Sequence, residues 1–178
     1  MSSTVTIRAN FEAFMERFEH EVYNAEPFPK FWEPNETLVD FYGFKVPNVG
    51  VSFLNEEMEH HDFMENFTFG SRMGNYALSL LCMILMDMKY SENFVSEAKI
   101  LGWGTLVKDL MKAGLGLGFL LDRLRELAWS IFSLRAKAEL EALELRVAES
   151  NKLLEMLDSR GAASMPSTSV TYGLLWLE

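Results

Sequence analysis

The sequence predicts an all-α fold, a helical bundle or hairpin with a long C-terminal coiled-coil-like helix and an irregular, aromatic-rich N-terminal connector. Apolar residues recur at helical spacing over about ninety positions from Phe69 to Arg160, and no proline interrupts them. Beyond residue 75, the glycines of this block lie only at Gly102, at Gly104 and in the tract 114–118. The 14 Phe and 11 Met residues supply bulky, adaptable side chains that fill the gaps between crossing helices.

The chain is long and apolar enough to bury a core in one principal domain with appendages, since 49% of its 178 residues are hydrophobic. We expect three segments. Residues 1–68 form an acidic N-terminal segment with a helix, the connector and a surface helix. Residues 69–160 form the helical core with its long last helix, and residues 161–178 form a flexible linker and an apolar tail.

The net charge of −10 is concentrated at the front of the chain, where residues 1–68 hold thirteen acidic and only four basic side chains. An acidic surface repels the phosphate backbone of nucleic acids, so we expect no nucleic-acid partner. A solvated acidic face that aids solubility is the simplest interpretation of this charge.

The single cysteine, Cys82, lies in the most apolar stretch of the chain and is predicted to be a buried thiol. Residues 1–10 lack the apolar core of a signal peptide, and the stretch around Cys82 is shorter than the roughly 20 residues that span a bilayer. We therefore expect an intracellular protein, cytoplasmic or nuclear, with no membrane span.

The first element is predicted over Ile7–Asn24, where apolar side chains spaced by three and four form one stripe of an amphipathic helix. Prolines at 27, 29 and 34 then forbid regular helix, so residues 25–50 are predicted as a connector that packs through single aromatic anchors. Short extended pieces are compatible with residues 37–46, although the pattern does not predict a sheet.

The next two helices are predicted over residues 51–66, as an acidic surface helix, and over 73–90, as the central helix with Ser71 as its N-cap. Ser91 is predicted to cap the following helix, which ends before Gly114. Gly102 and Gly104 either break that helix or let a neighbour approach closely. The glycine tract then predicts a turn and a helical hairpin.

The last helix is predicted over residues 117–157 and has an apolar stripe that rotates near residue 138. Its front half is expected to dock on the domain, while its rear half seeks a partner helix, because about forty residues span on the order of 60 Å. Ser150 occupies one expected apolar position. The predicted partner-helix interface consists of Leu134, Leu140, Leu143, Val147, Leu154 and Leu157.

The tail over residues 170–178 alternates apolar and polar side chains after the small, polar linker 161–169. The pattern fits an edge strand, an anchor to the body or the beginning of a longer element, and it does not choose among them.

Metal-capable side chains converge only around Glu57 and His60, which have the Glu-x-x-His spacing of dinuclear iron bundles. Those sites need a second such motif, which this chain lacks, so we expect a solvated acidic helix and no metal. His20 is predicted to lie on the surface, and burial of Cys82 argues against a nucleophile. The glycine tract lacks the strand and the Lys-Ser/Thr of a P-loop. The sequence therefore predicts no catalytic residue and no cofactor.

Three consecutive helical motifs, over residues 76–86, 100–110 and 116–126, resemble the C-terminal helical domain of plant phospholipase-like, aluminium-responsive proteins. They resemble more loosely the helical tails of plant MATH and coiled-coil proteins. The shared order is an apolar helix, a helix with a Val-Lys-Asp-Leu-type segment, and a glycine-bounded turn into a leucine-rich helix. The resemblance covers roughly residues 65–140 and implies an intracellular, all-helical plant module with no catalytic residues to carry over.

Two functions follow as hypotheses. The first is a non-enzymatic protein–protein interaction or oligomerisation module that acts through its long amphipathic helix, with a protein partner or a second copy. The alternative is a lipid- or metal-dependent enzyme, based on the family label and on the Glu57/His60 spacing.

Overall fold

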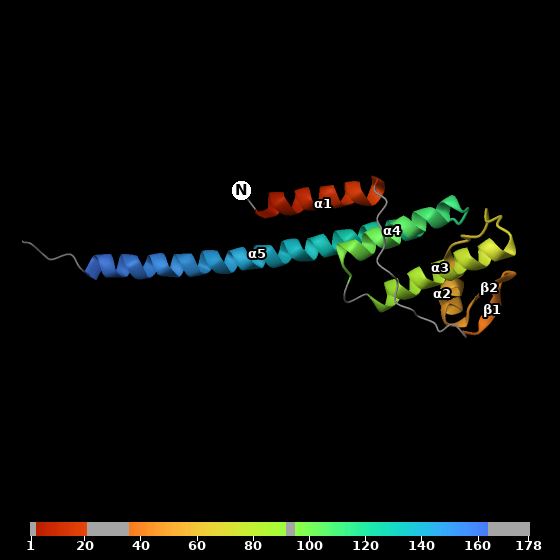
Figure 1. Cartoon of the computed structure of the whole chain (residues 1–178). Coiled ribbons are helices and arrows are strands. Elements are labelled where there is room, and N and C mark those ends of the chain that lie inside the picture. The colour runs from red at the N-terminus through yellow and green to blue at the C-terminus, as the bar shows by residue number, and fades with distance from the viewer. Residues whose placement is uncertain (1–2, 21–35, 92–94, 164–178) are drawn as a thin grey trace, which may run out of the picture. The chain divides into compact units, whose positions relative to one another are not determined.

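The structure is a computed structural model that describes residues 3–20, 36–91 and 95–163 (Figure 1). These residues form five helices and one two-stranded sheet, which confirms the predominantly helical fold. The chain divides into two compact units, residues 1–134 and residues 135–178. The predicted boundaries after residues 68 and 160 stay a prediction.

Unit 1 begins with α1 (Ser3–His20), whose apolar stripe buries Phe14 and Phe18. Lys108, from a later helix of the same unit, donates hydrogen bonds to the carbonyls of Phe18 and Glu19 in the last described turn of α1. A cation at this end complements the partial negative charge of the helix terminus, so α1 is held both by its rings and by its last turn. Within the described residues this helix extends to His20. The predicted extension to residue 24 lies outside them.

A β-hairpin, β1 (Leu38–Phe41) and β2 (Phe44–Pro47), replaces the irregular end of the predicted connector. Tyr42 and Gly43 have φ angles of 50° and 87°, the left-handed pair that a two-residue hairpin turn requires. Asp40 supports the turn, because its Oδ2 accepts a hydrogen bond from the Gly43 amide at 3.2 Å. Residues 25–35 of the predicted connector lie outside the described part.

Helix α2 (Asn48–His60) begins directly after the hairpin and ends six residues before the predicted end at residue 66. The helix stops at His61, whose backbone is extended. Phe63 is fully buried, and its carbonyl oxygen accepts a 2.8 Å hydrogen bond from the Gly116 amide. That carbonyl is therefore used by a distant loop rather than by a helical turn.

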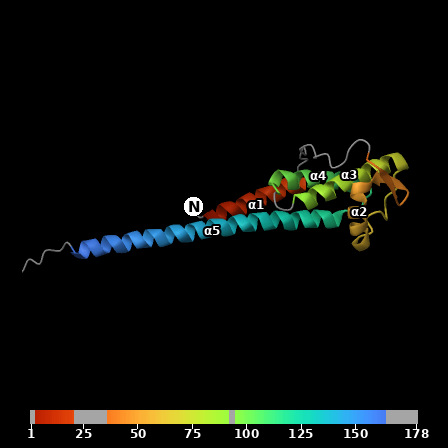
Figure 2. The same ribbon diagram turned by 90° about the horizontal axis from the view of Figure 1, so that it is seen from below.

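Helix α3 (Ser71–Tyr90) is the predicted central helix, and Leu78, Leu81 and Ile84 are fully buried along it. The prediction that Ser71 caps this helix is wrong, because the N-cap is Gly70 and Ser71 is the first helical residue. Helix α4 (Glu97–Lys112) packs beside α3 (Figure 2).

The prediction that Ser91 caps α4 is wrong. The capping residue is Ser96, whose hydroxyl accepts a 3.2 Å hydrogen bond from the Lys99 amide. Ser91 instead ends α3, where its hydroxyl donates to Asp87.

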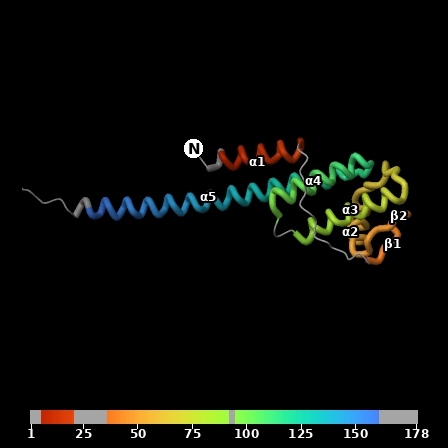
Figure 3. The backbone as a smooth tube through the Cα atoms, in the orientation of Figure 1, coloured from red at the N-terminus to blue at the C-terminus, as the bar shows by residue number. Residues whose placement is uncertain are grey.

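Gly102 and Gly104 do not break α4, which is continuous from Glu97 to Lys112. Of the two alternatives left by the sequence, close approach of a neighbour is correct at Gly104, against which Phe18 packs. The chain reverses after Gly114, which has a φ of 95°, and enters α5 (Gly118–Ala163), as the predicted hairpin requires (Figure 3).

The part of α5 in unit 1 is docked on the core, as predicted for the front of the last helix. The buried side chains recur every three or four residues. They are Leu120, Leu124, Ala128 and Phe132; Leu121 is buried beside this stripe, and Leu117 is buried just before the helix begins.

No helix in the described part of the chain is long and apolar enough to cross a membrane. The predicted apolar tail at 170–178 lies outside the described residues, and so does the predicted linker from residue 164 onward. Residues 161–163 of that linker belong to α5.

Candidate interaction surface

Unit 2 presents a row of exposed apolar side chains on α5. Val147 is 59% exposed and Leu157 is 65% exposed, whereas Leu120 and Leu124, in the part of α5 that belongs to unit 1, are fully buried. Exposed apolar side chains are common one at a time, but a contiguous row of them is a candidate interaction surface.

This row follows a heptad repeat. Leu140, Val147 and Leu154 are seven residues apart and take the a positions, and Leu143, Ser150 and Leu157 take the d positions. We call these six residues the α5 seam. Apolar a and d positions over nearly three heptads are the pattern by which one helix packs against another.

Ser150 fits within this seam although it is polar. Its hydroxyl donates a 2.8 Å hydrogen bond to the carbonyl of Arg146, one turn earlier in the same helix. Its hydrogen is therefore already bonded, so burial against a partner would not leave a donor without an acceptor.

Five of the six residues predicted as the partner-helix interface belong to the seam. The sixth, Leu134, is exposed but lies in unit 1. It precedes Leu140 by six residues, so its side chain points about 120° away from that of Leu140 around the helix axis. Leu145, which is 72% exposed, also lies off the seam and takes an f position, on the opposite face.

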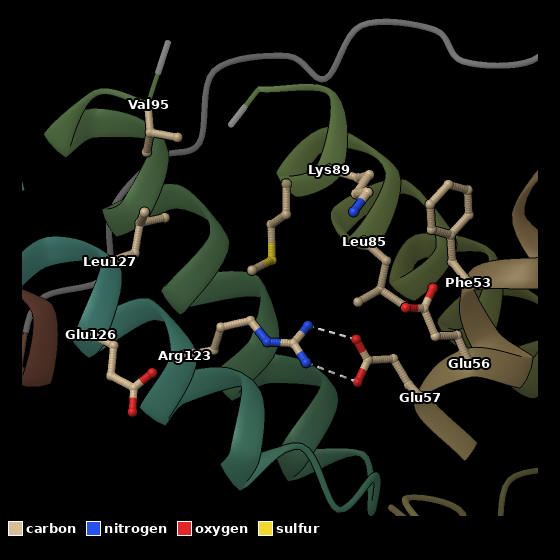
Figure 4. A pocket seen from close by; sticks show the side chains of 10 residues that line it. Phe53, Glu56, Glu57, Leu85, Lys89, Val95, Arg123, Glu126 and Leu127 are labelled. Atoms are coloured by element: carbon tan, nitrogen blue, oxygen red, sulfur yellow. Dashed lines mark hydrogen bonds and ion pairs between the residues drawn. The ribbon is translucent and has the colours of Figure 1, made fainter. Parts of the chain in front are cut away.

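A cavity of about 480 Å³ lies in unit 1 between α2, α3 and α5, with Val95, two residues before α4, also in its lining. Arg123 of α5 crosses it and forms a bidentate ion pair with Glu57 of α2, with Nη1–Oε1 at 2.6 Å and Nη2–Oε2 at 3.2 Å (Figure 4). The ten described side chains that line it include charged groups and an apolar wall but no hydroxyl, thiol or imidazole. The lining thus offers the charge pairing of a structural contact.

The predicted metal candidates are used elsewhere. Glu57 is buried against Arg123, while His60 is exposed with its Nδ1 3.0 Å from the carbonyl oxygen of Glu56. His61 stacks on the ring of Phe119 with centroids 3.8 Å apart. Among the residues that the structure describes, no three His, Cys, Asp or Glu side chains gather as a metal site would require.

His20 is exposed on α1 and Cys82 is fully buried on α3, as the sequence predicts. Burial raises the pKa of the Cys82 thiol to about 12, so almost none of it is thiolate at neutral pH. A nucleophile at this position would need an activating base and solvent access.

Sequence reasoning missed a buried polar network between α3 and α4. Asp87 accepts hydrogen bonds from Lys99 Nζ at 3.0 Å, from Ser91 Oγ at 3.1 Å and from Trp103 Nε1 at 2.8 Å. Lys99 Nζ also lies 2.6 Å from Ser91 Oγ. Within the described residues, every buried side-chain nitrogen or oxygen has a hydrogen-bond partner, so this network is structurally complete.

Comparison with known proteins adds no relative. No protein-family model matches the chain, and no curated protein and no solved structure matches it.

Proposed function

We propose that the chain is a non-enzymatic protein–protein interaction or oligomerisation module that binds a partner helix through the α5 seam. The observation that carries the proposal is the exposure of the apolar a and d side chains along unit 2, whereas the apolar stripe in the earlier turns of the same helix is buried. Burying an exposed leucine or valine contributes about 1.5–3 kcal/mol per side chain, so a helical partner would gain from covering this row.

The charge around the seam supports a protein partner. Lys137 and Glu144 take e positions and Glu139 and Arg146 take g positions, where coiled coils place the residues that select a partner. Mixed charge at the flanks favours a helix with complementary charges over a lipid surface or a phosphate backbone.

We also propose that the chain is related to plant phospholipase-like proteins, which its helical motifs resemble, and that it acts inside the cell, in the cytoplasm or nucleus. The enzymatic alternative gains no support from the described site residues, because Glu57 pairs with Arg123 and lies apart from any cluster of metal-capable side chains.

The test compares the double variant Leu143→Glu/Val147→Glu with the matched control Leu145→Glu. Both place carboxylates on the same helix, but only the double variant places them on the seam. We expect it to lose either self-association, measured by sedimentation equilibrium, or a specific co-purifying protein, measured by quantitative mass spectrometry. The control should keep both. If the seam variant and the control behave like the wild type in both measurements, the proposal is wrong.

A further inference from the structure

The charged positions beside the α5 seam are arranged with opposite polarity along its two flanks. At the e positions the charge begins positive with Lys137 and ends negative with Asp158. At the g positions it begins negative with Glu139 and ends positive with Arg160. An identical helix laid in the opposite direction therefore brings unlike charges together on both flanks.

We propose that the partner of the α5 seam is a second copy of the same helix, paired antiparallel so that Leu140 of each copy packs against Leu157 of the other. This inference rests on the proposed function and names its partner. The same register packs Leu143 against Leu154 of the second copy.

The flanking charges then pair without a like-charge contact. In an antiparallel coiled coil, e positions neighbour e positions and g positions neighbour g positions. Lys137 lies beside Asp158 of the second copy, and Glu139 lies beside Arg160 of the second copy. The remaining flank contacts, Glu144 with Asn151 and Arg146 with Leu153, are neutral or place an arginine stem on an apolar side chain.

The central layers explain the position of the one polar seam residue. Val147 of each copy faces Ser150 of the other, so a branched side chain meets a small one. The Ser150 hydroxyl keeps its 2.8 Å hydrogen bond to the carbonyl of Arg146 in its own helix. The other four layers pair leucine with leucine.

Competing arrangements are less favourable. A parallel, in-register pair places Glu139 beside Glu144 of the second copy, since g then neighbours the following e position. Sliding the antiparallel pair by one heptad toward the N-terminus brings Arg146 beside Arg146 and Glu144 beside Glu144. Sliding it by two heptads brings Arg125 beside Arg160, and it sets Glu126, a carboxylate, against Leu157 in the apolar layer.

The orientation is tested by oxidising a mixture of the full-length variants Leu140→Cys and Leu157→Cys. The proposed register predicts a mixed disulfide and no homodimeric one, because two copies of position 140 lie about 25 Å apart at 1.5 Å per residue. The native Cys82 is fully buried and leaves the introduced thiols as the reactive ones. Homodimeric disulfides from each variant alone would overturn the antiparallel arrangement.

The register is tested by a charge exchange. Lys137→Asp should weaken the dimer about tenfold, since two attractive contacts become repulsive, and Lys137→Asp/Asp158→Lys should restore it to within about twofold. Lys152→Asp, the same change at an outward f position, should leave the dissociation constant unchanged. Circular dichroism checks that each variant keeps its helix. Failure of the exchange to restore a weakened dimer would overturn the register.

Failure of this inference is distinguishable from failure of the proposed function. A wild-type chain that stays monomeric at millimolar concentration overturns the second copy as partner. The proposed function still holds in that case if Leu143→Glu/Val147→Glu, but not Leu145→Glu, loses a co-purifying protein.

Discussion

Gly104 of α4 and Phe18 of α1 are in such close contact that a Cβ atom on Gly104 would lie 2.5 Å from Cε2 of the Phe18 ring. Lys108 and Arg125 lie over the same ring, with 4.9 Å and 5.9 Å between the cation and the ring centroid. The ring of Phe18 is therefore fixed on several sides, and its position depends on the missing side chain at residue 104.

Gly104→Ala is expected to destabilise the protein by about 1–3 kcal/mol, because overpacking displaces the fixed ring. An alanine in an unobstructed helix interior would instead stabilise by about 1 kcal/mol. The midpoint of urea unfolding decides the sign.

The matched control is Gly118→Ala, where no atom lies within 4 Å of the added Cβ. It should be neutral or slightly stabilising. Combining Gly104→Ala with Phe18→Leu should cost less than the sum of the two single changes, because the smaller side chain makes room for the methyl group. Additive costs would contradict the steric explanation.

Asp87→Asn should destabilise the protein by about 2–3 kcal/mol. Both carboxylate oxygens of Asp87 accept hydrogen bonds, one from Trp103 and the other from Lys99 and Ser91, whereas an amide has only one oxygen and would turn a donor toward another donor. The cost stays below that of a fully buried ion pair, because the Lys99 side chain is 33% exposed.

Chemical denaturation followed by far-UV circular dichroism measures this cost, and Asp109→Asn is its control. Asp109 is an exposed aspartate whose partner Lys112 lies one turn away on the same helix, so its change should stay within about 0.5 kcal/mol. Equal effects of the two substitutions would show that the buried network contributes nothing of its own.

Helix periodicity was the reliable signal in this sequence. Three- and four-residue spacing located the central helix and the last helix, because burial on one face imposes that spacing wherever helices pack. The glycine tract located the turn before the last helix. The same three- and four-residue spacing picks out five of the six α5 seam residues, which are exposed, and their role as an interface stays a prediction. The burial of Cys82 followed from its apolar neighbours for the same reason.

The remaining features depend on tertiary contacts that spacing does not encode. The hairpin requires a positive φ at Tyr42, a residue with no preference for that conformation, so no Asn-Gly signal marks it. Ser91 and Ser96 are equally good N-caps in isolation. They differ in their tertiary contacts, because the Ser91 hydroxyl donates a hydrogen bond to Asp87. An aspartate in an apolar helix was the one available hint of that network.

The docking of α1 is expected to weaken in acid. A hydrogen bond from Arg125 holds the pKa of Glu19 below its ordinary value of 4.5, with burial opposing and the charge of Arg125 adding to it. Because the pKa is lower in the folded state, the contribution of Glu19 is fully present above pH 4.5 and is lost as the pH falls through the folded-state pKa.

Glu19→Gln should therefore remove part of this acid dependence and weaken docking at neutral pH. The effect should be about 0.5–1 kcal/mol, since both side chains are roughly one third exposed. Trp129 reports the docking through its edge-on contact with Phe11 of α1, at 5.3 Å between ring centroids, and can be followed by fluorine NMR of fluorotryptophan. In the control variant Glu16→Gln, changed at an exposed position on the same helix, the docking of α1 should depend on pH as it does in the wild type.

Cys82 is expected to react with a thiol reagent only when the protein opens. Its side chain is fully buried on α3, and a Cβ on Gly50 of α2 would lie 2.7 Å from its sulfur, so backbone closes off the thiol. With a pKa raised to about 12 by burial, the thiolate fraction is about a thousandfold below that of a free cysteine.

Ser52→Cys, at an exposed position on α2, supplies a matched thiol in the same molecule. Ellman's reagent should modify the introduced thiol at once and Cys82 at least about a thousandfold more slowly, with urea removing the difference. Two thiols that react at similar rates in the folded protein would mean that α2 and α3 separate readily, and that the contact between Gly50 and Cys82 does not hold them together.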